Sequence, residues 1–380
     1  MFAPGAGVRP RGSAPDGISC ASNRFAGRVG GTADAMNSAP LPWSFSGWGD
    51  ETLVGPARDV AADVDGSLAL ARTHDDVARS MGHDTWRLFS ALATMGSVDL
   101  TSARAVEPHW DAVAILDQAG DCHPERATWG VYAATPPGTS LAATHRADGG
   151  WQLSGTKPWC SLADRVSHAL VTASVEGSPP GLFAVALGRP GVAVDAGGWV
   201  PRGLRDITTS TVSFADVAAD PVGDPGWYLE RPGFAWGGIG VAAVWFGGAA
   251  AVAGALWDAA RSRPPDQVAL MHLGACDVAL HTTLLSLRDA ASRIDSGEAG
   301  GPVGPVLAGR VRAQAARCAE EVLATVGHAL GPGPLALDPA HAARVADLML
   351  YLRQHHAERD LAALGRLVTP DVDQHPGGAS

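Results

Sequence analysis

The chain is poor in cysteine and lacks paired cysteine motifs. Its 380 residues include five cysteines, none of them in a C-x-x-C pattern. They are Cys20, Cys122, Cys160, Cys276 and Cys318. Scattered cysteines argue against a disulfide framework and against a structural zinc site. We therefore predict a cytoplasmic protein that binds no metal.

Positive charge is also scarce. The chain has 28 lysines and arginines against 39 aspartates and glutamates, so its net charge is -11, and its pI is about 5.6. Such an acidic chain is a poor partner for nucleic acid or for an anionic membrane surface. The nearest candidate for a membrane span, residues 237–256, is uncharged but is rich in Gly and Ala and has few large side chains. We interpret it as a buried helix rather than a membrane span.

The length and the hydrophobic content of 46% are sufficient for two or three packed domains. The first 40 residues are Gly, Pro, Ser and Ala with isolated arginines and no periodicity, so we predict a disordered extension, or an over-extended start with Met36 as the initiator. We predict a helical domain at 41–127, a β domain at 128–224, a helical bundle at 225–368 and a disordered tail at 369–380.

Hydrophobic periodicity predicts the elements within these domains. Apolar residues at helical spacing predict helices at 59–70, 84–95 and 101–120, the last capped by Asp99. His109 in that last helix is interpreted as a packed residue rather than a ligand. Short apolar runs between turn residues predict strands at 142–145, 150–154, 167–173, 181–186, 192–195 and 210–214. Four further helices, at 234–263, 266–296, 305–330 and 339–365, predict an antiparallel bundle.

Two short motifs in residues 129–163 carry the most specific signal. Residues 135–140 read T-P-P-G-T-S, and residues 154–161 read S-G-T-K-P-W-C-S. They resemble the middle-domain signature of the acyl-CoA dehydrogenase flavoproteins, T-E-P-G-x-G-S-D followed by N-G-x-K-x-W-I-T-N-A. The first motif is one residue short, and Pro136 and Leu141 replace the acidic residues of the family. The predicted order of helices, β domain and bundle is also that of the family.

The resemblance implies an α+β fold with a reduced N-terminal helical domain, a middle antiparallel β domain and a C-terminal four-helix bundle. It implies an FAD cofactor, with Trp159 against the flavin ring, Ser161 near its N5 atom and Thr135 near its pyrimidine edge. Ser140 would lie near the phosphates or the substrate. It also implies that Arg261 and His272 contact the FAD of a neighbouring subunit, with Arg263 an equally suitable candidate for the arginine. The protein would then be a homodimer or a homotetramer.

The catalytic base of the family, a glutamate, is missing from both of its usual positions. One position, at the start of the first bundle helix, holds Gly237, Gly238 and Ile239. The other, near the end of the last helix, holds His355, with Glu358 three residues further. His355 is able to act as a base, and Glu358 would serve if the register slips. The alternative is that this segment is only a solvated helix end.

Three classes of function follow from the resemblance. The first is α,β-dehydrogenation of an acyl-CoA or other acyl thioester, with an electron-transfer flavoprotein or another electron acceptor as partner. The second is a flavin-dependent monooxygenase on the same fold, which needs no base for the α-proton. The third is a flavin-binding or oligomerisation homologue without catalysis. The general resemblance favours the first class, and the missing glutamate weakens it.

Overall fold

The structure is a computed structural model that describes residues 47–121, 124, 126–147, 149–195 and 197–369. The predicted disordered extension, with the proposed initiator Met36, lies outside the described residues, and so does the predicted tail beyond Thr369. Everything below concerns the described part of the chain.

Five helices precede the first strand: α2 (Glu51–Asp59), α3 (Val64–Thr73), α4 (Asp75–Arg79), α5 (Thr85–Val98) and α6 (Leu100–Ala119). Asp99 caps α6, as predicted, because its carboxylate accepts the Ser102 backbone N–H at 2.7 Å. The predicted helix at 59–70 is wrong. The chain breaks after Asp59, and Asp63 starts α3 by accepting the backbone N–H of Gly66.

The strands form a sheet that closes on itself. They are β1 (Trp129–Tyr132), β2 (Leu141–His145), β3 (Trp151–Ser161), β4 (His168–Val175), β5 (Gly181–Ala186), β6 (Val192–Asp195) and β7 (Thr209–Val222). The order is β1-β4-β2-β3-β7-β5, and β5 pairs back with β4, so five strands make a ring with β1 and β6 outside it. Closure leaves few free edges.

The prediction of a purely antiparallel β domain is wrong in two places. β4 runs parallel to both β1 and β2, whereas the other pairs are antiparallel. The reason is the chain path. β3 lies between β2 and β4 in sequence, and β4 returns in the direction of β2 to close the ring. The four-residue strand β1 was also missed.

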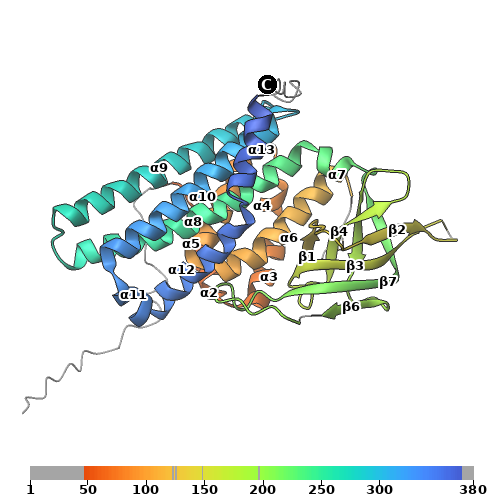
Figure 1. Ribbon diagram of the computed structural model, residues 1–380, viewed down its shortest axis with the longest axis horizontal. Helices are drawn as coiled ribbons and strands as arrows, with labels where there is room; N and C mark the ends of the chain where they lie inside the picture. Colours follow the sequence, from red (N-terminus) through yellow and green to blue (C-terminus); the bar gives the residue numbers. More distant parts are fainter. Residues whose placement is uncertain (1–46, 122–123, 125, 148, 196, 370–380) are drawn as a thin grey trace, which may run out of the picture. The chain divides into compact units, whose positions relative to one another are not determined.

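Helices follow the sheet: α7 (Trp227–Glu230), α8 (Pro232–Ser262), α9 (Gln267–Asp295), α10 (Val303–Leu330), α11 (Pro332–Leu337), α12 (Pro339–Tyr351), the 3₁₀ turn η1 (Leu352–Gln354) and α13 (Glu358–Val368). Figure 1 shows α8, α9 and α10 side by side, as predicted for the bundle. The last predicted helix, 339–365, is wrong because the chain breaks at 352–357. Ala357 has a φ of +48°, which no right-handed helix accommodates.

Glycine explains how α8 is buried. A Cβ at Gly247 would collide with the carbonyl oxygen of Ala93 on α5, and one at Gly96 would collide with that of Val244 on α8. The backbones of α5 and α8 are therefore in direct contact, which only glycine permits at these two points. Trp245 and Phe246 of α8 are fully buried. Residues 237–256 thus belong to a core helix, as predicted.

By length and composition, α8 and α9 would each be able to cross a membrane. In α8 89% of the apolar window is buried in the fold, whereas in α9 only 28% is buried. On α9, Val268, Met271, Val278 and Leu285 are all exposed. Their spacing places them on one face of the helix.

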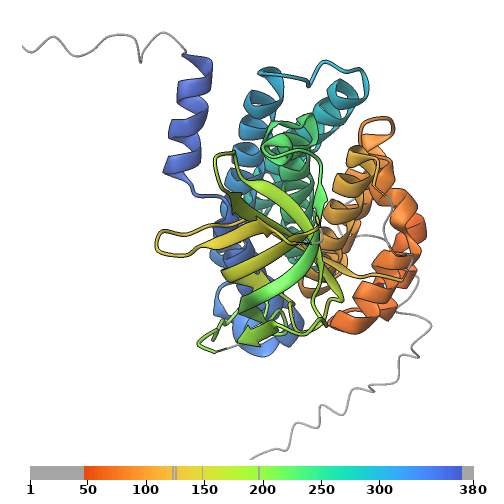
Figure 2. The same cartoon turned by 90° about the vertical axis from the view of Figure 1, so that its right-hand side faces the viewer.

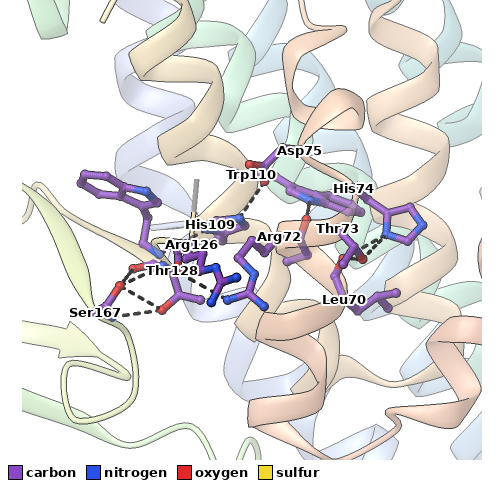
Figure 3. Close-up of polar contacts among 12 residues, drawn as sticks. Leu70, Arg72, Thr73, His74, Asp75, His109, Trp110, Arg126, Thr128 and Ser167 are labelled. Carbon is purple, nitrogen blue, oxygen red and sulfur yellow. Dashed lines mark hydrogen bonds and ion pairs between the residues drawn. The ribbon is translucent and has the colours of Figure 1, made fainter. Parts of the chain in front are cut away.

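Side chains of the helices contact the β domain at several points, among them Asp347 and His109. The Asp347 carboxylate of α12 accepts the Leu204 backbone N–H at 2.5 Å. His109 of α6 is fully buried, with its Nε2 2.9 Å from an oxygen of Asp75, and its Nδ1 accepts the Trp129 backbone N–H at 3.2 Å (Figure 3). With Nδ1 as acceptor, Nε2 carries the proton and donates it to Asp75. His109 is a packed residue, as predicted.

Candidate functional site

Trp159 is held out of the sheet at the end of β3. The pairing of β3 with β7 shifts register between Lys157 and Cys160, and Trp159 has a φ of +60°. A left-handed backbone costs a non-glycine residue about 1–2 kcal/mol. Trp159 is 62% exposed, whereas Trp48, Trp110 and Trp245 are fully buried. An exposed aromatic held by a strained backbone is typical of a surface that a ligand covers.

Two hydroxyl groups from the motifs that contain or precede Trp159 accept hydrogen bonds from cationic side chains. Ser161 Oγ accepts a hydrogen bond from Nη2 of Arg104 at 3.2 Å. Thr135 Oγ1 accepts one from Nζ of Lys157 at 3.1 Å. A hydroxyl that accepts from a cation keeps its own proton to donate, although Ser161 Oγ also lies 3.2 Å from the Thr209 hydroxyl, and either of those two oxygens can be the donor. We call Thr135, Trp159 and Ser161 the Trp159 face.

Lys157 is the only lysine in the chain, and its side chain is buried. Its ammonium also donates to the carbonyl oxygen and to the hydroxyl of Thr172, both at 2.8 Å. Burial lowers the pKa of Lys157 to about 8. The Lys157 ammonium, held by its bonds to Thr172, therefore fixes the direction of the Thr135 hydroxyl.

Ser140 lies just before β2, opposite Gly155 of β3. Gly155 has a φ of +126°, and a Cβ there would collide with the carbonyl oxygen of Ser140. That carbonyl accepts the Thr156 backbone N–H at 3.0 Å. Both motifs recognised in the sequence therefore meet at this point of the sheet, and Ser140 is exposed there.

Arg104 of α6 connects the Trp159 face to a second region. Besides its bond to Ser161, its Nη1 lies 3.3 Å from Oε2 of Glu107, and its guanidinium lies over the Tyr351 ring. The Tyr351 hydroxyl donates to the same Glu107 oxygen at 3.1 Å. Burial raises the pKa of Glu107, and Arg104 opposes that shift.

Glu107 belongs to the wall of a cavity of about 650 Å³. The walls come from α6, α7, the start of α8, α10, α13 and residues 354–356. Its polar lining residues are Glu107, Asp111, Tyr228, Arg231, Arg312, Gln354, His355, His356 and Asp360. Leu229, Phe234, Val241, Leu364 and Leu367 are among its apolar ones. We call it the charged cavity.

Two charged groups in the charged cavity lack full partners. Arg231 is 6% exposed, and its Nη1 donates to Gln118 at 2.5 Å, but its Nε has no hydrogen-bond partner among the described residues. Asp111 lines the cavity and makes no hydrogen bond or ion pair with any described residue. Burial raises the pKa of Asp111, and Arg231 opposes that shift. Burial lowers the pKa of Arg231, and Asp111 opposes it.

Arg312 of α10 donates both of its Nη groups to backbone carbonyls. Its Nη1 donates to the carbonyl of Gly238 at 2.8 Å, its Nη2 donates to that of Gln354 at 3.1 Å, and the group lies over the Trp245 ring. Arg312 therefore ties the start of α8 to the break before α13. Figure 2 shows α13, in dark blue at the upper left, standing apart from the other long helices.

The structure separates the two predicted candidates for the base. His355 lines the charged cavity, whereas Glu358 is the exposed first residue of α13 and does not line it. The Nε2 of His355 is buried without a hydrogen bond, because the nearest carboxylate oxygen, on Asp360, lies 3.9 Å away. Burial lowers the pKa of His355, and Asp360 opposes that shift.

Arg261 and His272 lie elsewhere. They belong to the end of α8 and the start of α9, and Figure 1 shows the link between these helices at the end of the bundle away from the strands. Arg261 is exposed and pairs with Asp258 at 2.5 Å. Within one chain they do not join the Trp159 face. A role for them at the cofactor of a neighbouring subunit stays a prediction.

Sequence reasoning missed Arg104, Glu107, Asp111, Arg231, Arg312 and the role of Lys157. The sequence did contain a pattern that indicates one pair of these residues. Glu107 and Asp111 are four residues apart on a helix whose other face is apolar, so they share one face. Lys157 could have been singled out because it is the only lysine in the sequence.

A flavin fits the Trp159 face. Its ring is planar and apolar on its faces and carries carbonyl and nitrogen acceptors at its edge. The exposed indole offers a stacking surface, and the hydroxyls of Ser161 and Thr135 are placed as donors. Among the described residues no group of His, Cys, Asp and Glu is arranged to hold a metal ion.

Comparisons with known proteins show the fold. No protein-family model matches the chain, and no curated protein matches it. Among solved structures, the butyryl-CoA dehydrogenase of Megasphaera elsdenii is 16% identical with a TM-score of 0.72, over 84% of this chain and 95% of that one. FMN-bound TdsC from Paenibacillus sp. A11-2 is 17% identical with a TM-score of 0.73, over 87% and 97%.

KijD3, solved with FMN and dTDP-3-amino-2,3,6-trideoxy-4-keto-3-methyl-D-glucose, is 20% identical with a TM-score of 0.70, over 86% of this chain and 93% of that one. The chain therefore has the fold of the acyl-CoA dehydrogenases, in a divergent form, as predicted. Identities this low establish the fold alone.

Proposed function

We propose that the chain is a flavin-dependent oxidoreductase of the monooxygenase type, which acts on a small polar substrate in the charged cavity. The observation that carries this proposal is the lining of the cavity. Glu107, Asp111, Arg231 and Arg312 all face a space that is joined through Arg104 to the Trp159 face.

An acyl thioester is a poor match for this lining. An acyl chain would strip water from charged groups without replacing their hydrogen bonds, at a cost of roughly 1–3 kcal/mol for each group left unpaired. Residues 237–239 and 355 also lack the carboxylate that α-proton abstraction uses in the family. A monooxygenase needs no such base.

The residues of the Trp159 face hold the cofactor. Trp159 packs against the ring, Ser161 and Thr135 donate hydrogen bonds to its edge, and Ser140 lies near the phosphates or the substrate. A reduced flavin supplies the electrons that activate dioxygen. Arg104 and Lys157 orient the two hydroxyls and so fix where the edge of the ring lies.

We propose FAD as the flavin, with its pyrophosphate and adenosine contacted by Arg261 and His272 of a second copy. The exposed row Val268, Met271, Val278 and Leu285 on α9 gives that copy an apolar face to cover. A homodimer or homotetramer by light scattering is expected, and a monomer at micromolar concentration would contradict this. We further propose that the protein is cytoplasmic.

Two solved structures with the same fold hold FMN together with a molecule that is not an acyl thioester. KijD3 was solved with FMN and an amino sugar nucleotide, and TdsC was solved with FMN and indole. A nitrososynthase from Micromonospora carbonacea also shares the fold, at 18% identity and a TM-score of 0.67. Their ligands suggest which chemistry to test first.

Anaerobic flavin reduction separates the three classes of function. FAD-loaded protein should keep its flavin absorbance when mixed with acyl-CoAs of several chain lengths, and chemically reduced protein should be reoxidised by oxygen. Bleaching by an acyl-CoA would overturn the monooxygenase proposal. Bound flavin that does neither would indicate a homologue without catalysis.

The second candidate is α,β-dehydrogenation of an acyl thioester with His355 as the base, followed by electron transfer to an electron-transfer flavoprotein. The unpartnered Nε2 of His355 at the cavity wall favours it. The His355 pKa lies below 6.5, so this group is neutral and able to accept a proton at neutral pH. His355→Gln would then abolish bleaching by acyl-CoA, whereas the exposed Glu358→Gln would not.

A further inference from the structure

The charged cavity is lined by a carboxylate whose partner is missing. Asp111 lines the cavity and makes no hydrogen bond or ion pair with any described residue. The Arg231 side chain also lines the cavity, but its unpartnered Nε is buried in the protein and is not open to that space. A polar group left without a partner costs about 1–3 kcal/mol, so an unpartnered carboxylate on a cavity wall is arranged for a ligand.

Gly237 makes room for the carboxylate. A Cβ at this position would lie 2.8 Å from Oδ1 of Asp111, closer than carbon and oxygen approach without one of them moving. Gly237 has an ordinary helical backbone, so no turn or positive φ requires glycine there. Glycine at position 237 is therefore explained by the space that the Asp111 carboxylate occupies, and not by the backbone conformation of Gly237.

The charged and titratable groups around Asp111 come from four different helices or helix ends. Glu107 lies one helical turn earlier on α6, Arg231 lies at the N-terminal boundary of α8, Tyr228 lies on α7 and Arg312 on α10. Glu107 is already held by Arg104 and Tyr351. Asp111 is therefore the carboxylate of the cavity that is free to accept a proton from a ligand.

We propose that Asp111 binds a protonated amine of the substrate and accepts its proton, in the charged cavity that Arg231 also lines. In this step the substrate N–H bond breaks, an O–H bond forms on Asp111, and the electron pair stays on nitrogen. The free pair makes the nitrogen a nucleophile. The inference rests on the proposed monooxygenase function only for the later oxidation of that nitrogen.

An amine is the protic group that this carboxylate suits. Proton transfer is efficient when the two pKa values are close. The pKa of an aliphatic ammonium lies nearer to that of a carboxylic acid than the pKa of a hydroxyl or of a carbon acid does. Burial raises the pKa of Asp111 and so narrows the gap to the ammonium.

Three shape-matched probes test this site by calorimetry, without any turnover: benzylamine, benzyl alcohol and benzoate. The wild type should bind benzylamine most tightly. Asp111→Asn should weaken benzylamine binding about tenfold, the usual value of a charge-assisted hydrogen bond, and leave benzyl alcohol within about twofold. The control Asp117→Asn, on the same helix at an exposed ion pair with Arg79, should leave all three unchanged.

Gly237→Ala gives a second variant that keeps every charge. The added methyl should displace the Asp111 carboxylate and weaken benzylamine binding, while the melting temperature stays the same or rises because alanine favours the helix. No saturable benzylamine binding by the wild type, or equal binding by Asp111→Asn, would overturn the proposal. Since flavin binding and oxidation are measured separately, amine binding without oxidation would instead count against the proposed function.

Discussion

The Trp159 face and the charged cavity are neighbours that are built in opposite ways. The face consists of one exposed indole and hydroxyls from strand ends, with its cations hidden behind them. The charged cavity is lined directly by charged side chains, and its walls come from helices that are far apart in sequence. The first arrangement suits a flat cofactor that stays bound, and the second suits a polar molecule that exchanges.

Arg104 is the residue where the two regions meet, because it contacts Ser161 on one side and Glu107 on the other. Changes on the face should therefore alter flavin affinity with little effect on folding. Changes at Arg104 should alter both properties. The predictions below break or sharpen this contrast, from the largest expected effect to the smallest.

The charge hidden behind the face is the most easily observed feature, because Lys157 is the only lysine. Protein with ¹³C-labelled lysine should give one lysine signal that titrates at about pH 8 rather than at the ordinary 10.5. Between these pH values the unfolded chain binds the proton more tightly, so stability should rise with pH, by up to about 3 kcal/mol. Lys157→Met should remove that rise, and a signal titrating at its ordinary pKa would refute the prediction.

Trp159→Ala should weaken flavin binding about thirtyfold, or roughly 2 kcal/mol, because the stacking surface is lost. The melting temperature should not fall, since the indole is exposed and its backbone is strained. Fluorescence titration with FAD measures the affinity. Trp199→Ala, at another exposed tryptophan that lines none of the described cavities, is the matched control.

Arg104→Met should weaken flavin binding and also destabilise the fold, each by about 1–2 kcal/mol. Ser161 would lose the donor that orients it, and Glu107 would lose its nearest cation. Chemical denaturation and FAD titration of the same samples measure both effects. An effect on stability alone would show that the face and the cavity are independent.

Arg261→Ala should weaken FAD binding about fivefold and leave FMN binding unchanged, because FMN lacks the adenosine half. The same change at Arg263 tells which of the two arginines is used. Equal losses for FAD and FMN would remove this helix end from the cofactor site.

Glu358→Gln should change flavin binding, stability and turnover by less than about twofold, since exposed charges contribute little. A large loss of turnover in this variant, with folding intact, would show that Glu358 takes part in the reaction.

The residues of the Trp159 face were named from sequence because they lie in two short motifs with turn residues between them. Thr135, Trp159 and Ser161 are all within one stretch of chain, and the hydrogen bond from Lys157 to Thr135 joins the two motifs. Their role at a cofactor stays a prediction. The strands at 181–186 and 192–195 were also predicted to the residue, because turn residues bound them on both sides.

The charged cavity was not predictable in the same way. Asp111, Arg231 and Arg312 are each at least about eighty residues from the next in sequence, and they meet only after α6, α8 and α10 have packed. The break at 352–357 was missed because the apolar spacing continues through it. That break brings His355 to the cavity and leaves Glu358 on the outside.

The claim that the face and the cavity form one active site is tested most directly by the visible spectrum of bound FAD. Addition of benzylamine should perturb the flavin bands of the wild-type protein, since a ligand beside Asp111 alters the groups that reach Ser161 through Glu107 and Arg104. In Asp111→Asn, which still binds FAD, the same perturbation should require about ten times more benzylamine, in line with its weaker binding. Folded protein that binds no flavin, or bound flavin whose spectrum ignores an amine that binds, would contradict the account.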